Sequence, residues 1–418
     1  MRVLNIILIS FLCLLTACGG GSDTPKPPPP VVQTAEGNFI DSVVEGLEYS
    51  SGEQSGITSD SGTFIYELAT NGDPADVTFT VGAITLGTVT GNAIITPVDL
   101  TGSDTSLANT QNIVRFLLML DFDGDSSNGI TISSEVREIA ANWVQVDFTS
   151  SDFEADLASI ISDVSVVDSR TPILPTTLVA QDHLEGTLSC LSSGVFKGSF
   201  SGGDNGTFLL WIQHQRFDPF AFGDNTPRVG VTSALVFSTD ENLVSGVAPQ
   251  RGLSFDSDKQ FISGVVSTGA EFSGDLENYQ SITNGVWNNG LSNESGTFIG
   301  ERVGGDENAN HRLAGFFNLQ GFPFSADGSG LLALDIMADN SVTGIMVTLR
   351  GDETTLSGSL TANVITVSGG GNELELAFDA DGTDSSNDLA LGTTSGFIGT
   401  MSGASGTSDV IGTSCQPD

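Results

Sequence analysis

The chain is poor in positive charge. Only 13 of its 418 residues are Lys or Arg, against 52 Asp and Glu, so its formal net charge at pH 7 is −39. A surface this acidic repels the phosphates of nucleic acids, and we therefore expect no nucleic-acid partner. Repulsion between copies of the chain also favours solubility, which is the simplest interpretation of the charge.

Motifs of the common enzyme classes are missing as well. The three histidines, His183, His214 and His311, are far apart in the chain, and neither His-Glu-x-x-His nor Gly-x-Ser-x-Gly occurs. Tryptophan is scarce. Trp211 and Trp287 could form a sugar-stacking surface, but packing in the core is the favoured interpretation. We therefore expect a protein without catalytic activity.

The first residues are typical of an exported protein. An apolar run from Val3 to Leu15 follows Arg2 and is shorter than a membrane-spanning helix. Its end, residues 15–18 (Leu-Thr-Ala-Cys), resembles the bacterial lipobox at all four positions. The resemblance implies that residues 1–17 are a signal peptide and that Cys18 carries a covalent lipid. An ordinary secretory signal with an incidental cysteine is the alternative.

The segment after the lipobox, residues 18–36, has the composition of a tether. Its glycines favour flexibility and its prolines, from Pro27 to Pro30, favour an extended spacer. In Gram-negative lipoproteins an Asp after the cysteine tends to retain the protein at the inner membrane, whereas this chain has Gly19. The resemblance therefore implies a lipid anchor in the outer membrane, and the tether is expected to hold the folded body away from the lipid surface.

The four cysteines predict one disulfide. Cys13 leaves with the signal peptide and Cys18 is lipidated, so Cys190 and Cys415 remain as a pair in an oxidising compartment. We expect these two residues to be joined, closing a loop that contains the whole C-terminal part of the chain.

Glycine is abundant at 51 residues while 39% of the chain is hydrophobic, which indicates many short strands joined by tight turns. We expect a mainly β protein with a small α+β module over residues 37–188. Strands fill this module up to about residue 100, and helical spacing then begins at Ser106 and ends at Leu120. Further helices are expected from Ser133, from Ser151 with a capping box to Glu154, and just before Cys190.

This β-then-helix stretch resembles a module of predicted bacterial surface lipoproteins. The resemblance rests on three pieces of sequence, residues 39–47, 95–100 and 120–130. It implies an extracytoplasmic lipoprotein and no established chemistry.

The remainder, residues 190–418, is expected to be an antiparallel β-barrel or sandwich built from a weak tandem duplication, 191–305 and 312–415. Residues 193–198 match 313–317, and residues 295–302 match 395–400. Whether the two copies close together or separately is open. The glycine- and phenylalanine-rich stretch 198–208 resembles the barrel lobes of transferrin-binding-protein-B-like surface lipoproteins, which implies an architecture alone.

An acidic loop between two predicted helices is the candidate metal site. Asp121, Asp123 and Asp125 alternate along it, and alternating carboxylates can converge on a hard cation such as calcium. Asn128 could add a carbonyl oxygen and Glu135 a later carboxylate, although the spacing departs from that of an EF-hand. The alternative is an acidic turn that caps the helices.

Three classes of function remain. The first, which we favour, is a surface-exposed binding or adhesion lipoprotein whose partner is a protein, a glycan or a solute. The second is a structural or assembly lipoprotein that faces the periplasm. The third is an enzyme that acts on polysaccharide, which would need paired carboxylates in a cleft beside Trp211 or Trp287.

Overall fold

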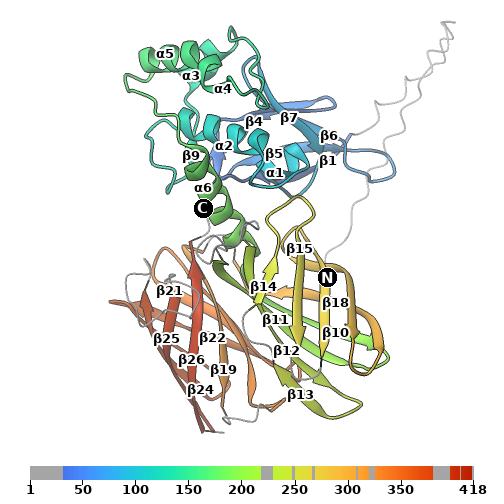
Figure 1. Cartoon of the computed structure of the whole chain (residues 1–418). Helices are drawn as coiled ribbons and strands as arrows, with labels where there is room; N and C mark the ends of the chain where they lie inside the picture. Colours follow the sequence, from blue (N-terminus) through green and yellow to red (C-terminus); the bar gives the residue numbers. More distant parts are fainter. Residues whose placement is uncertain are drawn as a thin grey trace, which may run out of the picture.

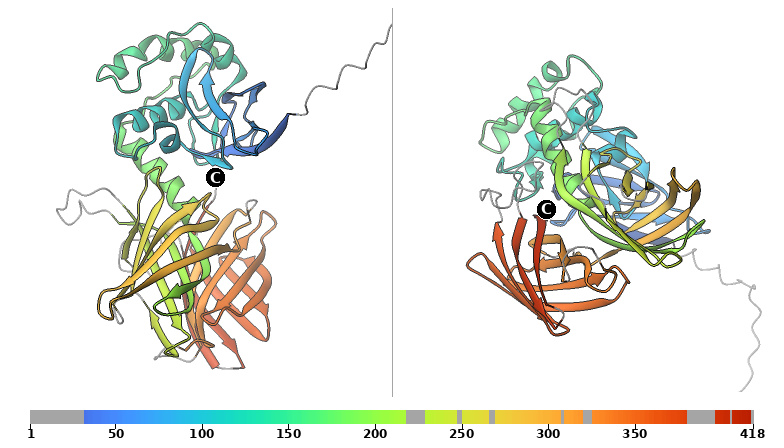
Figure 2. Two further views of the ribbon diagram at one scale, coloured as in Figure 1. Left: turned by 90° about the vertical axis from the view of Figure 1, so that its right-hand side faces the viewer. Right: turned by 60° about the horizontal axis from the view of Figure 1, so that its bottom comes forward.

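The computed structural model describes residues 32–217, 229–246, 250–265, 269–306, 309–319, 325–379, 396–404 and 406–416. Cys18, the predicted signal peptide and most of the predicted tether lie outside these ranges. The protein is mainly β, as predicted, with a small N-terminal α+β module and two antiparallel eight-stranded barrels. The barrels stand side by side with the module at one end of them (Figures 1 and 2).

The strands of the N-terminal module form three small sheets. The first has three strands, β5 (Thr63–Leu68), β1 (Gln33–Phe39) and β8 (Ile94–Ile95). The second has four, β4 (Gln54–Ile57), β3 (Glu48–Ser51), β6 (Asp76–Val81) and β7 (Ile84–Thr90). The third is the pair β2 (Val44–Glu45) and β9 (Ile130–Thr131). The predicted tether is therefore too long, because its residues 33–36 already pair with β5.

Six helices occur among the described residues of the module: α1 (Pro97–Thr101), α2 (Ala108–Leu120), α3 (Ser134–Ala140), α4 (Phe153–Asp156), α5 (Ala158–Val167) and α6 (Thr177–Ser192). α2 lies where helical spacing predicts it. The predicted capping box at Ser151 is wrong, since α4 begins only after Asp152. The carboxylate of Glu154 instead lies 2.5 Å from the buried guanidinium of Arg115, so a tertiary ion pair replaces the local cap.

The first barrel contains β10 (Gly194–Gly202), β11 (Gly206–Phe217), β12 (Val229–Ser238), β13 (Leu243–Gly246), β14 (Gln250–Leu253), β15 (Gln260–Val265), β16 (Ala270–Glu277), β17 (Ser281–Asn289) and β18 (Glu294–Val303). β13 and β14 pair with different ends of β12 and together occupy one position of the ring, so these nine strands form an eight-stranded barrel. Pairing of β11 with β12 closes it.

Aromatic rings fill the interior of the first barrel. The ring of Phe298 lies 5.0 Å from that of Phe208 and 5.3 Å from that of Phe272, measured between centroids. Leu184 and Leu188 of α6 join the same core, so this helix runs out of the N-terminal module and closes one end of the barrel (Figure 1).

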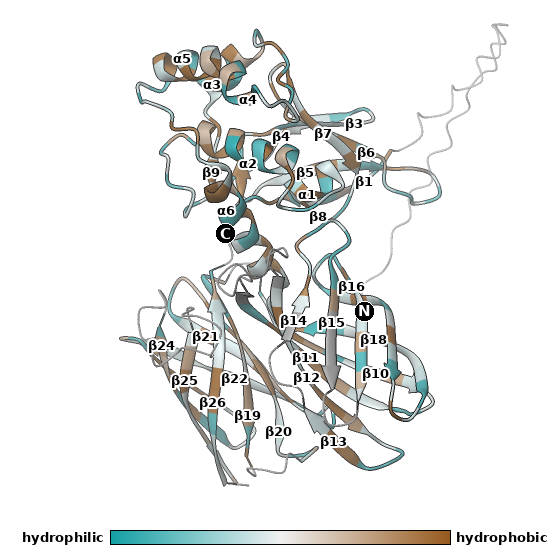
Figure 3. Ribbon diagram, in the orientation of Figure 1, coloured by the Kyte–Doolittle hydropathy of each residue, from teal (hydrophilic) through white to brown (hydrophobic). Residues whose placement is uncertain are grey.

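The second barrel contains β19 (His311–Asn318), β20 (Ser329–Ile336), β21 (Ser341–Thr348), β22 (Glu353–Thr361), β23 (Val364–Gly369), β24 (Asn372–Asp379), β25 (Gly396–Gly403) and β26 (Gly406–Cys415). It closes where β19 pairs with β26. Its interior is mostly aliphatic, and hydrophobic and hydrophilic residues are interspersed along its strands (Figure 3).

The two barrels pack against each other through their outer walls. Leu209 and Trp211 of β11 point outward and join a separate apolar cluster with residues of the second barrel, whereas Phe208 and Leu210 point inward. The hydroxyl of Thr207 donates a hydrogen bond to the carbonyl of Leu349 across this interface. Both faces of β11 are therefore buried, as expected for a strand between two cores.

The predicted duplication is correct for one of its two matches. Residues 193–198 and 313–317 lie in or beside β10 and β19, the first strands of the two barrels. The match of 295–302 with 395–400 is wrong, because β18 is the last strand of its barrel and β25 the next-to-last. Phenylalanine rings cover glycines of neighbouring strands, as Phe397 covers Gly412, so Gly/Phe strings recur regardless of strand position.

Candidate functional site

A cavity of about 770 Å³ lies where the N-terminal module, α6 and the two barrels meet. The module contributes residues near β1 and β5, α6 contributes its last two turns, and the first barrel contributes the β16–β17 turn and the end of β18. Arg312, at the start of β19, comes from the second barrel. Residues more than two hundred positions apart in the sequence thus line one space.

The β16–β17 turn places a buried tyrosine in the cavity wall. Asn278 and Tyr279 both have positive φ, 50° and 57°, a conformation that bulky residues seldom adopt. The ring of Tyr279 is nearly inaccessible, and the Nζ of Lys259 lies 5.7 Å from its centroid. Burial, together with the nearby carboxylate of Asp99, raises the pKa of the Tyr279 hydroxyl well above its usual range. This side chain is therefore neutral at physiological pH.

Arg302, at the end of β18, joins the cavity to the C-terminus of α6. Its Nη1 donates to the carbonyls of Leu191 (2.9 Å) and Tyr279 (3.0 Å), and its Nη2 donates to that of Ser193. The last carbonyls of a helix lack partners within the helix and carry partial negative charge, so a guanidinium stabilises them. Burial, together with the charge of Arg312 and against that of Asp335, lowers the pKa of Arg302 to about 9.

Arg312 brings a second positive charge to the same wall. Its Nε donates to the carbonyl of Asp306 at 3.2 Å, and it pairs in register with Asp335 of β20. The Asp335 carboxylate accepts hydrogen bonds from the backbone N–H groups of Gly305 and Asp306, both at 3.1 Å. Burial raises the pKa of Asp335, while these hydrogen bonds and Arg312 lower it.

The N-terminal module contributes polar side chains to the lining, together with apolar ones such as Ile40 and Val43. The polar ones include Asn38, Ser61 and Thr63, and Thr187 of α6 and Gln280 of the β16–β17 turn add to them. These amides and hydroxyls can both donate and accept hydrogen bonds. Among the described residues of the lining, Glu36 is acidic and exposed, and none is a histidine. The arrangement suits recognition of a polar molecule better than proton transfer.

The predicted calcium loop is only partly assembled. Asp121 is buried, with one carboxylate oxygen accepting from the N–H of Thr131 at 3.0 Å and the other, Oδ2, without a hydrogen-bond partner. Burial raises its pKa; the Thr131 N–H lowers it, and the adjacent Asp123 raises it again. The amide of Asn128 donates to Asp123 Oδ2 at 3.0 Å. Asp121, Asp123 and Asn128 therefore lie together.

The other two predicted ligands make local contacts instead. The carboxylate of Asp125 accepts from the N–H and hydroxyl of Ser127, at 3.2 and 2.6 Å. Glu135 is exposed on α3 and accepts from the hydroxyl of Ser134 at 2.9 Å. Within the described ranges, the carboxylates of this loop do not form a group of three that could share one ion.

His183 lies among groups that superficially suggest a catalytic triad. Its Nε2 is 3.4 Å from the Ser42 hydroxyl and 3.6 Å from Asp41 Oδ1. Both neighbours face the same ring nitrogen, whereas a triad needs the base and the carboxylate on opposite nitrogens. His183 therefore packs α6 against the module.

The remaining candidates are structural. Cys190 and Cys415 form the predicted disulfide, which joins the end of α6 to β26. His214 has a ring nitrogen close to both sulfurs, but sulfurs joined to each other are not available as thiolate ligands. Trp211 and Trp287 are 6% and 4% exposed, so both pack in cores and neither offers a surface for stacking sugars.

Sequence reasoning missed the cavity and both of its arginines. Arg302 and Arg312 belong to no motif, and their closeness depends on how the barrels pack. One signal was present: in a chain with so few basic residues, two of them only ten positions apart flank a polar loop.

Comparison with known proteins identifies no family. No family model and no curated protein matches the chain. Kievitone hydratase from Nectria haematococca is a distant structural neighbour, at 8% identity and a TM-score of 0.21, covering 55% of this chain and 91% of its own. A protein of unknown function from the DUF3598 family of Nostoc punctiforme covers 55% and 98%, at 9% identity and a TM-score of 0.15. Likenesses this distant carry no argument about function.

Within the described ranges, α2 and α6 and the shorter helices all fall short of the length and apolar character that a membrane-crossing helix needs.

Proposed function

We propose that this protein is a lipid-anchored binding protein of the outer membrane, exposed at the cell surface and without catalytic activity. The observation that carries the proposal is the cavity of about 770 Å³ at the junction of its three parts. Its volume is in the range of small-molecule sites, and such sites occur preferentially between domains. The lipobox-like residues 15–18 supply the anchor.

The packing of the barrels supports the junction as the binding site. Aromatic rings and α6 fill the first barrel, and aliphatic side chains fill the second. At the end of the first barrel farther from α6, a pocket beside Trp287 and Phe200 has a volume of only about 80 Å³. A ligand of monosaccharide size fits the junction and not this pocket.

Calcium is proposed as a structural ion of the loop that holds Asp121 and Asp123. The support is the buried Oδ2 of Asp121, which lacks a hydrogen-bond partner while a second carboxylate stands beside it. A cation would offset the repulsion between the two carboxylates. Asp125 and Glu135 would have to leave their serine partners to join it.

The anchor is tested by replacing the lipidated cysteine. Cys18→Ala should release the protein from the membrane fraction, whereas Cys13→Ala, inside the predicted signal, should leave it anchored. Protease added to intact cells should cleave the wild-type protein. Membrane retention of Cys18→Ala contradicts the anchor. Protection until the outer membrane is broken contradicts surface exposure and favours the periplasmic structural role.

Binding in the cavity is tested by native mass spectrometry of the full chain, purified from its membranes in a non-ionic detergent. A small molecule should co-purify with the wild type. Thr63→Trp, which fills the cavity, should lose it, and Thr366→Trp, on the exposed face of β23, should keep it. Absence of any bound molecule from the wild type contradicts the binding function.

A further inference from the structure

We infer that the junction cavity recognises a small polar ligand through a carboxylate or phosphate group, which Arg302 and Arg312 hold. The inference rests on the proposed binding function and adds the class of ligand. It follows from the charges in the cavity wall, from the space left beside one guanidinium, and from the hydroxyl and amide groups that line the same cavity.

The part of the cavity wall formed by Arg302 and Arg312 is positively charged, whereas the net charge of the protein is negative. The chain has 13 basic residues against 52 acidic ones, and yet two arginines line one cavity. Within the part of the chain that the structure describes, the hydrogen bonds of Arg302 go to the carbonyls of Leu191, Ser193 and Tyr279. These bonds use at most three of the five N–H groups of the guanidinium, and neutral carbonyls leave its full positive charge, which an oxyanion would neutralise.

The positive charges of Arg302 and Arg312 repel each other. The charge of Arg312 adds to burial in lowering the pKa of Arg302, and Asp335 only partly opposes it. The Asp335 carboxylate is itself held by two backbone N–H groups. A ligand oxyanion between the guanidinium groups would remove the repulsion, and the planar guanidinium matches carboxylate and phosphate geometry.

Glycine keeps the side of Arg302 open. Gly305 lines the cavity at a φ of +92°, and a Cβ placed on it would lie 3.1 Å from the Nε of Arg302. The preceding Gly304 also has positive φ, 71°. Positive φ at both glycines lets the backbone turn here, and Gly305 places no side chain against the guanidinium.

The rest of the ligand is expected to be hydroxylated. Asn38, Ser61 and Thr63 of the N-terminal module line the same cavity as the arginines, and such groups recognise hydroxyls and amides. The volume accommodates a single sugar ring with its acid group. A sugar acid or a sugar phosphate therefore matches both groups of side chains, with the anion at the arginines and the hydroxyls at the module.

The experiment measures the melting temperature of the full chain in detergent with millimolar glucuronate, inorganic phosphate or glucose 6-phosphate. Glucose is the neutral control, and sodium chloride of matched ionic strength is the reference. Ligands that bind only the folded state raise the melting temperature. We expect at least one of the three oxyanions to raise it and glucose to leave it unchanged. A shift with phosphate alone would identify a free phosphate site, and one with glucuronate a sugar-acid site.

Three variants test whether the rise in melting temperature arises from binding in the cavity. Arg312→Gln and Gln280→Glu, which remove a positive charge from the cavity or add a negative one, should abolish the shift, and Arg312→Lys should restore part of it. Arg350→Gln is the matched control, because Arg350 lies on the surface 2.6 Å from Asp327 and away from the cavity. It should keep the full shift.

Two results overturn the inference: no shift with any oxyanion, or a shift that survives in both Arg312→Gln and Gln280→Glu. A different result would contradict the proposed binding function itself: the absence of any co-purified molecule in native mass spectrometry. A neutral molecule found there would leave the binding function in place and still contradict the ligand class.

Discussion

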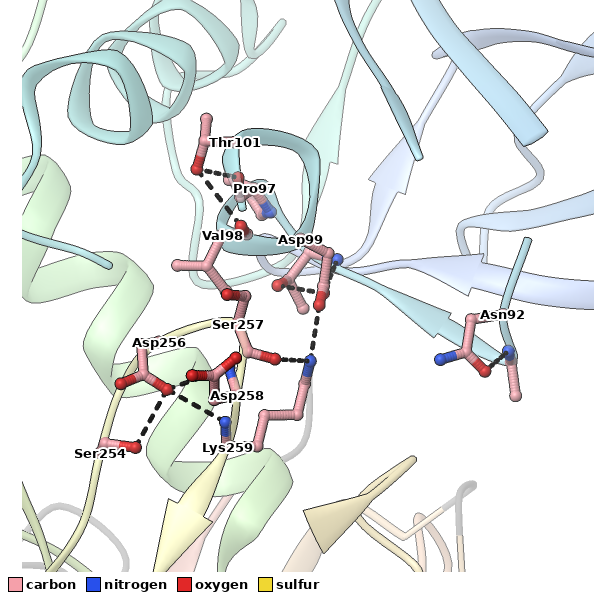
Figure 4. A network of polar contacts seen from close by, with 12 residues as sticks. Asn92, Pro97, Val98, Asp99, Thr101, Ser254, Asp256, Ser257, Asp258 and Lys259 are labelled. Atoms are coloured by element: carbon pink, nitrogen blue, oxygen red, sulfur yellow. Dashed lines mark hydrogen bonds and ion pairs between the residues drawn. The ribbon is translucent and has the colours of Figure 1, made fainter. Parts of the chain in front are cut away.

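The Nζ of Lys259, in the turn before β15, lies 2.5 Å from the Oδ1 of Asp99 in α1 (Figure 4). The same Nζ donates to the carbonyl of Ser257 at 3.3 Å, and the Oδ2 of Asp99 accepts from the N–H and hydroxyl of Thr96. One carboxylate thus caps α1 and binds the first barrel. This contact couples the position of the N-terminal module to the barrel, and so to the shape of the cavity between them.

Removing Lys259 should loosen this contact. Both side chains are about 15% exposed, so Lys259→Met leaves a largely buried carboxylate without its cation and should cost roughly 1–3 kcal/mol of unfolding free energy. Lys197→Met is the control, because the pair of Lys197 with Glu353 is much more exposed and should contribute less than about 1 kcal/mol. Chemical denaturation of the two variants measures the difference, and equal losses would contradict a special role for Lys259.

The disulfide should stabilise the barrels strongly. Cys190 and Cys415 are 225 positions apart, and in the chain-entropy account a loop of this length contributes roughly 5 kcal/mol by restricting the unfolded chain. Reductant should therefore lower the melting temperature of the wild type. The double variant Cys190→Ser/Cys415→Ser should melt at the lower temperature with or without reductant. A wild-type melt that reductant leaves unchanged would remove the disulfide as a stabilising element.

Asp121 should make the protein less stable as pH rises, the reverse of the usual effect of a carboxylate. Burial raises its pKa in the folded protein, so the folded state binds this proton more tightly than the unfolded chain does. The unfolding free energy therefore falls as pH rises from about 4 through the raised pKa. Without calcium, Asp121→Asn should lack this fall and be at least as stable as the wild type at pH 7. Calorimetry across this range in a chelator measures it.

Asp147 is the control for Asp121, because its pKa is shifted in the opposite direction. Hydrogen bonds from the hydroxyl and N–H of Thr149 lower its pKa, so its contribution is present at neutral pH and is lost as pH falls. Asp147→Asn should therefore be less stable at pH 7. Added calcium should raise the melting temperature of the wild type and of Asp147→Asn, and not that of Asp121→Asn. No calcium effect on the wild type would rule out the proposed ion.

The aromatic interior of the first barrel should be sensitive to a single deletion. Phe298 is buried among Phe208, Phe272 and Phe261, and Phe298→Ala should cost about 3–5 kcal/mol through lost contacts and the cavity left behind. Ile299, the next residue of β18, is 70% exposed on the outer wall. Ile299→Ala should change stability by less than about 1 kcal/mol, and urea unfolding followed by Trp287 fluorescence compares the two.

Local patterns in the sequence predicted some elements well. The apolar stripe of α2 and the alternation of Phe208 and Leu210 in β11 were readable, because helix and strand periods are properties of neighbouring residues. The alternation could not show that Leu209 and Trp211, on the other face, are also buried. Their partner is the outer wall of a second barrel, whose position depends on the packing of the whole chain.

The predictions for residues 33–36 and for Glu154 were wrong for the same reason: each depends on a partner far away in the sequence. Residues 33–36 resemble a tether in composition, and only their pairing with β5 makes them a strand. Glu154 has the spacing of a capping box but binds Arg115, thirty-nine positions earlier, because pairing a buried guanidinium outweighs an exposed cap.

The sequence by itself determined the mainly β class, the helical segment after residue 100, and the pairing of Cys190 with Cys415. Composition indicates the class, the spacing of apolar residues indicates the helix, and the number of cysteines left after processing indicates the pair. The tertiary structure decided that each copy closes its own barrel, since closure depends on hydrogen bonds such as those between β19 and β26. It also decided that Arg302 and Arg312 share one cavity. No local pattern encodes that proximity, because it results from the packing of the N-terminal module and the two barrels against one another.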